Sequence, residues 1–122
     1  MSYRSCILIF LTAISLSCTK TSDLGNLNTL DWKSDENGCQ GKRLKFLPEL
    51  SSVRENLMGQ TQNEIIQLLG KPDHQEIYKR SQKFFTYYIS GNDTCKGSAK
   101  ETVYLQIRFN ALGNSNEVLI VK

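Results

Sequence analysis

The chain has 122 residues, enough for one domain around one hydrophobic core, since domains commonly hold on the order of 100 to 150 residues. Its 15 Lys and Arg against 12 Asp and Glu give a formal net charge of +3. One of the 15, Arg4, precedes Cys18, so from Cys18 onward 14 positive residues face 12 negative ones, a balance of +2. This balance, without a basic stripe, argues against a nucleic-acid-binding protein.

The first 17 residues have the composition of an export leader. Arg4 gives a positive start, residues 6–16 form an apolar run, and Ser17 is a small residue at its exit. As a helix this run would be about 16 Å long, against a hydrocarbon core of roughly 30 Å. We therefore predict that residues 1–17 are a removable leader and not a transmembrane anchor.

Cys18, directly after the apolar run, resembles the lipobox of bacterial lipoproteins, in which a peptidase cleaves before a lipid-modified cysteine. The resemblance implies lipidation of Cys18 and attachment to a membrane through acyl chains, each buried methylene adding about 0.8 kcal/mol. Thr19 stands where enteric lipoproteins retained in the inner membrane carry Asp, which favours the outer membrane. The alternative is a plain secretory leader that is cut near Ser17 and leaves Cys18 free or paired.

Two further cysteines, Cys39 and Cys95, make an even pair in an exported chain. An oxidising compartment favours their pairing, and chain-entropy estimates give such a disulfide about 4 kcal/mol of stabilisation. A metal site is not expected, because two isolated cysteines and one histidine match no ligand spacing.

The segment 18–40 is expected to carry the lipid and act as a flexible tether. Residues 19–29 are rich in Ser, Thr, Asn and Gly, the usual composition of a spacer. Residues 30–39 have no periodicity, so we expect an irregular stretch held by Trp32 and the disulfide. The folded domain is predicted over residues 41–122.

Two helices are predicted at the start of this domain. Apolar residues recur at spacings of three and four from Leu47 to Leu57, and Pro48 sets the helix start near Leu47 because proline is tolerated in a first turn. Thr61 and Glu64 form the pattern of a capping box for a second helix, which ends at Gly70. The short connection predicts a helical hairpin.

The remaining sequence has the period of strands. Residues 84–90 are aromatic and β-branched, residues 102–109 alternate apolar with polar, and residues 118–121 are apolar, with another strand over 75–78. Residues 110–114 read as a hairpin loop. We expect an α+β fold in which the two-helix hairpin packs on a three- or four-stranded antiparallel meander sheet.

Strand parity suggests a partner-binding surface on this sheet. Phe84 and Tyr88 share one side of their strand, and Tyr104 and Arg108 lie on the polar side of the next. Tyr and Arg are enriched at binding hot spots. Two alternatives remain. Either the helices or the long loop cover part of this face, or Phe84 and Tyr88 are core while Phe85 and Tyr87 point outward.

No catalytic constellation is recognisable. His74, the only histidine, follows Pro72 as an exposed turn residue, and both cysteines of the domain are assigned to the disulfide. No phosphate-binding glycine motif occurs. We therefore expect a protein that is not an enzyme and needs no cofactor.

Three segments together resemble a known family. Residues 59–73, 85–88 and 105–118, with a helix ending in Leu-Leu-Gly-Lys-Pro, an aromatic strand and a Phe-Asn-Ala-Leu-Gly hairpin before Val118, are similar to the SmpA/OmlA (BamE-like) lipoproteins. The resemblance spans roughly residues 45 to 120. It implies an outer-membrane lipoprotein facing the periplasm, a non-catalytic scaffold or accessory module that contacts envelope proteins of the β-barrel assembly machinery and anionic lipid headgroups. The alternative is a secreted or tethered hydrolase inhibitor with the similar fold of β-lactamase inhibitor proteins, acting through its loop near Cys95.

Overall fold

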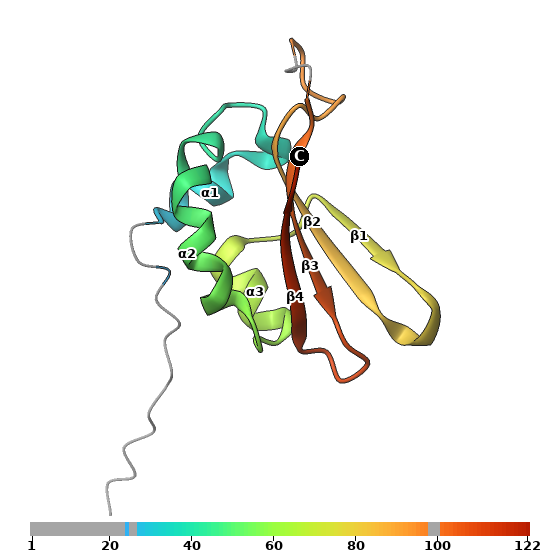
Figure 1. Ribbon diagram of the computed structural model, residues 1–122. Coiled ribbons are helices and arrows are strands. Elements are labelled where there is room, and N and C mark those ends of the chain that lie inside the picture. Colours follow the sequence, from blue (N-terminus) through green and yellow to red (C-terminus); the bar gives the residue numbers. More distant parts are fainter. Residues whose placement is uncertain (1–23, 25–26, 98–100) are drawn as a thin grey trace, which may run out of the picture.

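The computed structural model describes residue 24, residues 27–97 and residues 101–122 (Figure 1). The predicted leader and Cys18 lie outside these residues, so cleavage and lipidation stay predictions. Across the described residues, no helix is both long enough and apolar enough to span a membrane.

Four antiparallel strands form one sheet in the order of the chain (Figure 1). They are β1 (His74–Ile77), β2 (Lys83–Ser90), β3 (Val103–Phe109) and β4 (Ser115–Val121). Each strand pairs with the next along the sequence, so the sheet is a meander. The expected α+β class and antiparallel sheet are confirmed, and of the two strand counts that were open, four is correct.

Three helices cover one face of this sheet: α1 (Thr29–Ser34), α2 (Leu47–Leu57) and α3 (Gln62–Leu69) (Figure 1). The start of α2 at Leu47, with Pro48 in its first turn, follows the prediction. The capping box of α3 is also confirmed: the Thr61 hydroxyl accepts from the Glu64 amide at 3.2 Å, and the Glu64 carboxylate accepts from the Thr61 amide at 2.8 Å. Short 3-10 turns occupy Glu36–Gly38, Leu44–Phe46 and Lys79–Ser81.

Helix α1 corrects the expectation of an irregular tether up to residue 40. Asn28 caps it, because its side-chain oxygen accepts from the amides of Leu30 and Asp31 at 3.1 and 3.3 Å. Trp32 on this helix is fully buried, and Leu24 and Leu27 before it also join the core. The folded domain therefore begins well before residue 41. A helix of six residues makes fewer than two turns, so it leaves no periodic signal in the sequence.

The hydrophobic core fills the space between the helices and the sheet. Phe85 and Tyr87 of β2 point into it, which rules out the alternative in which these two residues face outward. Phe85 packs edge to face on Phe109 of β3 with ring centroids 4.6 Å apart. Burying a side chain of this size contributes about 1.5 to 3 kcal/mol. The other fully buried core residues of the helices and sheet are Trp32, Leu50, Leu57, Ile65, Leu69, Ile89, Leu105 and Ile107.

The predicted disulfide between Cys39 and Cys95 is present, with Cα atoms 5.3 Å apart. It joins the segment after α1 to the connection between β2 and β3. Asn92 reinforces the link by donating from its side-chain amide to the Asn37 side-chain oxygen at 3.0 Å. Gly38, at a φ of +67°, lies so close to β2 that a Cβ there would be 2.5 Å from the Ile89 carbonyl oxygen. Residues 91–97, which begin the connection from β2 to β3, are thus held at one end of the sheet, and we call them the fixed loop.

Candidate functional site: an aromatic groove on the open face

The helices leave the other face of the sheet uncovered (Figure 1). On this open face, register places Phe84 opposite Arg108 and Tyr88 opposite Tyr104. The predicted parity of these four residues is therefore correct, and none of them belongs to the fully buried core. Their role in binding a partner stays a prediction.

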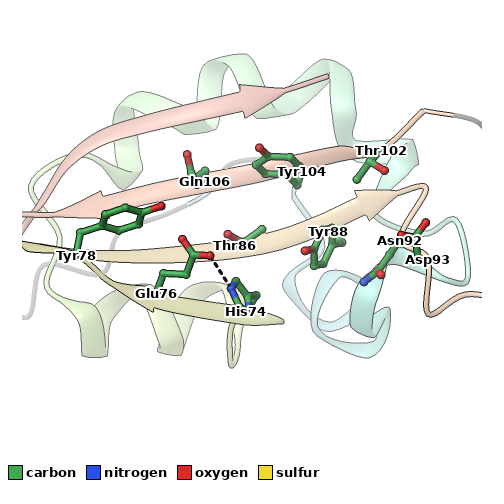
Figure 2. A pocket seen from close by; sticks show the side chains of 10 residues that line it. All are labelled: His74, Glu76, Tyr78, Thr86, Tyr88, Asn92, Asp93, Thr102, Tyr104 and Gln106. Carbon is green, nitrogen blue, oxygen red and sulfur yellow. Dashed lines mark hydrogen bonds and ion pairs between the residues drawn. The ribbon is translucent and has the colours of Figure 1, made fainter.

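A hollow of about 490 Å³ lies along the open face, and Figure 2 shows the side chains around it. We call it the tyrosine groove. It is lined by residues of β1, β2 and β3, by the residues just after β1 and just before β3, and by the fixed loop: His74, Glu76, Tyr78, Thr86, Tyr88, Asn92, Asp93, Thr102, Tyr104 and Gln106. Apart from the tyrosine rings and the threonine methyl groups, this lining is polar.

Two aromatic pairs contribute to the groove, and Figure 2 shows Tyr78 of one pair well apart from Tyr88 and Tyr104, which form the other. Tyr88 and Tyr104, neighbours across β2 and β3, meet edge to face with centroids 6.0 Å apart. In the other pair, Tyr78 meets Phe84 edge to face at 5.0 Å. Between the pairs lies Thr86, whose side chain stands at the groove floor. The groove therefore offers ring faces and edges around a polar centre.

The charged groups in the lining are mainly acidic. Glu76 and Asp93 contribute carboxylates, and none of the ten residues drawn in Figure 2 is Lys or Arg. His74 Nε2 lies 3.1 Å from Glu76 Oε1, with both side chains about half exposed. His74 begins a strand, so its assignment to a turn was wrong, while its exposure was predicted correctly.

The four residues proposed from sequence divide into two groups. Tyr88 and Tyr104 line the groove, and Phe84 supports Tyr78 at its edge. Arg108 lies outside the lining, where Arg108 Nη2 and Glu117 Oε2 are 3.1 Å apart and Nε donates to the Asn116 side chain at 3.3 Å.

Sequence reasoning missed the contribution of β1 and of the fixed loop. His74, Glu76 and Tyr78 alternate along the chain, and this period of two was the available signal. The alternation alone does not say which face of the sheet these side chains join. The pairing of His74 with Thr86 and of Glu76 with Phe84 places them on the open face.

A buried ion pair holds the strands beneath the groove. Arg43 Nη1 lies 2.6 Å from Asp73 Oδ2, and both side chains are almost fully buried. The same carboxylate oxygen accepts from the Tyr88 amide at 2.8 Å, and Oδ1 accepts from the Asn37 amide at 3.0 Å. One carboxylate thus ties the residue before β1 to β2 and to the segment that carries Cys39.

Arg43 also packs against aromatic rings on the helix side of the sheet. Its guanidinium carbon is 5.0 Å from the Trp32 ring centroid and 5.9 Å from that of Tyr87. Burial raises the pKa of the Tyr87 hydroxyl well above its usual value; the positive charge of Arg43 opposes this shift and Asp73 adds to it. The neutral hydroxyl donates to the Gly70 carbonyl oxygen at 2.8 Å.

The described residues contain no cluster of three or more His, Cys, Asp or Glu side chains placed to hold a metal ion. The only hydrogen-bond partner of the His74 ring in that part of the chain is Glu76. This arrangement supplies hydrogen bonds, charge and aromatic contact, which are the means of a binding site.

Fold and groove together define a two-layer α+β domain with one open, aromatic sheet face. Comparison of the chain with protein-family models, with curated proteins and with solved structures found no match. The resemblance to the SmpA/OmlA family thus stays a prediction from the sequence.

Proposed function

We propose that the chain is a bacterial envelope lipoprotein and acts as a non-catalytic module that binds protein partners through the open face. A single observation carries the binding role: the helices cover one sheet face and leave the other with tyrosines and polar groups around a hollow of about 490 Å³. Tyrosine is frequent at binding hot spots because its rigid ring gives a large contact area and its hydroxyl gives a hydrogen bond.

The proposed location depends on the sequence. The leader over residues 1–17 and the lipobox-like Cys18 support an acyl anchor in the outer membrane, with the domain in the periplasm. The resemblance to SmpA/OmlA proteins suggests that the partners belong to the machinery that assembles outer-membrane β-barrels.

Two experiments test this proposal in the native host. Wild-type chain is expected in the membrane fraction and the Cys18→Ala variant in the soluble fraction. A soluble wild-type protein would contradict the anchor. For binding, a photo-reactive residue at position 104 should cross-link a barrel-assembly component in intact envelopes. The same residue at Ser51, exposed on α2, is the matched control and should give no such product.

A hydrolase inhibitor is the second candidate, favoured by the loop that the disulfide and Asn92 hold in place. Protease inhibitors commonly bind through pre-organised segments, since rigidity lowers the entropic cost of association. A photo-reactive residue at Thr94, exposed on this loop, separates the two ideas. A cross-link to a hydrolase from position 94, without one to assembly components from position 104, would favour the inhibitor.

A further inference from the structure

The tyrosine groove has the chemistry to receive a cation. We propose that it binds the guanidinium group of an arginine side chain presented by the protein partner, an inference that rests on the proposed function. Its ring faces, two carboxylates and free hydroxyl groups form the complementary surroundings.

Charge is the first argument. Glu76 and Asp93 are the carboxylates of the lining, and the only group there able to carry positive charge, His74, already contacts Glu76. Among the described residues Asp93 makes no ion pair. Two carboxylates that line one hollow give it a negative potential, which attracts a positive ligand and repels an anionic one.

Unused hydrogen-bonding groups are the second argument. Thr86 is only 7% exposed, yet its hydroxyl forms no hydrogen bond within the part of the chain that the structure describes. The Thr86 hydroxyl is not one of the buried side-chain atoms without a partner, so it is open to the groove and can bond a ligand there. The Tyr88 and Tyr104 hydroxyls also make no hydrogen bond to any described residue. Each of these hydroxyls can accept from a guanidinium N–H.

The aromatic rings are the third argument, and the same domain already contains an example. On the helix side, Arg43 lies over Trp32 and Tyr87 and is paired with the Asp73 carboxylate. On the open side, Tyr88 and Tyr104 line the same groove as Glu76 and Asp93, and the groove lining contains no arginine. A planar guanidinium suits such a site better than an ammonium, because it stacks on rings while its N–H groups reach carboxylates.

The test is an NMR titration of the full chain in uncharged detergent micelles, with the disulfide intact. The probes are Nα-acetyl-arginine amide and Nα-acetyl-citrulline amide, which have similar shape but differ in charge. We expect the arginine probe to shift the amide signals of Thr86, Tyr88 and Tyr104 and to saturate at millimolar concentrations. The citrulline probe should bind at least about five-fold more weakly, as expected for loss of a partly exposed ion pair.

Variants locate the charge effect. Glu76→Gln and Asp93→Asn should each weaken arginine binding by about five-fold. Glu55→Gln, which removes the same charge from an exposed position on α2, should leave it unchanged. Added salt should weaken binding of the arginine probe to the wild-type chain, since mobile ions screen charges at an open site. The spectrum of each variant reports directly whether it is folded.

Several results would overturn the inference. Equal shifts from both probes would mean that charge does not contribute to binding and that the groove binds a neutral polar group, such as a sugar or an amide. No shift with arginine at tens of millimolar would exclude the site. The two proposals can also fail separately. If position 104 cross-links to assembly components but the chain binds no arginine, only the proposal of a guanidinium ligand is contradicted. If the chain binds arginine but gives no such cross-link, the proposed partner is contradicted.

Discussion

Replacement of Asp73 by Asn should destabilise the domain strongly, because the buried Arg43 charge would lose its counter-ion. The two side chains are 1% and 3% exposed, and their charged atoms are 2.6 Å apart. Removing one partner of a buried ion pair commonly costs about 3 to 5 kcal/mol. In the native chain each carboxylate oxygen of Asp73 accepts from one backbone amide, that of Asn37 or that of Tyr88. The NH2 group of an asparagine would face one of these amides, so that hydrogen bond would be lost.

Urea denaturation followed by Trp32 fluorescence would measure this loss. Trp32 is the only tryptophan, it is fully buried, and Arg43 lies over its ring, so its emission should report unfolding of the same region. Asp93→Asn is the matched control: it removes an exposed carboxylate and should change the unfolding free energy by no more than about 0.5 kcal/mol.

The double variant Arg43→Met with Asp73→Asn separates charge from packing. Without the guanidinium no charge is left unpaired, so the double variant should be no less stable than Asp73→Asn alone. If Asp73→Asn costs less than about 1 kcal/mol, or no more than Asp93→Asn, the ion pair between Arg43 and Asp73 does not stabilise the domain as argued above.

Three further perturbations test other parts of the structure. Since burial raises the pKa of Tyr87, the unfolded chain should release this proton above about pH 10 while the folded chain keeps it. The unfolding free energy should therefore fall by about 1.4 kcal/mol per pH unit as pH rises from there, and Tyr87→Phe should lack this part of the fall in pH-dependent urea titrations. Gly38→Ala and Gly41→Ala both place an alanine at positive φ, but only at Gly38 would the new Cβ meet backbone atoms. Gly38→Ala should therefore lower the unfolding free energy by at least about 2 kcal/mol more than Gly41→Ala in the same assay. Equal losses would contradict the close approach of Gly38 to β2. Replacing Cys39 and Cys95 together by Ser should lower the unfolding free energy by about 4 kcal/mol, as expected for a crosslink between residues 56 positions apart, and an unchanged thermal midpoint would contradict this.

Features with a local cause were predictable from the sequence. The capping box at Thr61, the proline in the first turn of α2 and the alternation in β3 each depend on neighbours a few residues away. The disulfide was also predictable, because only two cysteines remain once the N-terminal pair is assigned to the leader and the anchor. The open-face position of Tyr88 and Tyr104 followed from period-two parity alone.

Features that depend on distant partners were not predictable in the same way. Arg43 lies before α2, and a charged residue at such a position is usually exposed. It is buried here because Asp73 neutralises its charge and the Trp32 ring covers its guanidinium group. The six residues of α1 owe their place to the burial of Trp32 and not to a periodic pattern. Prediction of the groove required the register of β1 on β2, because this register pairs Glu76 with Phe84 and determines which face of the sheet each side chain joins.

The burial of Leu24 limits how far the domain could stand from a bilayer. Leu24 is only six positions from Cys18, and an extended chain advances at most about 3.5 Å per residue. The segment between them could therefore span roughly 20 Å at most. If acyl chains anchor Cys18 in the membrane, the distance between the folded domain and the lipid headgroups would not exceed about the diameter of the domain. Its partner would then have to be resident in that membrane or bring its arginine down to it.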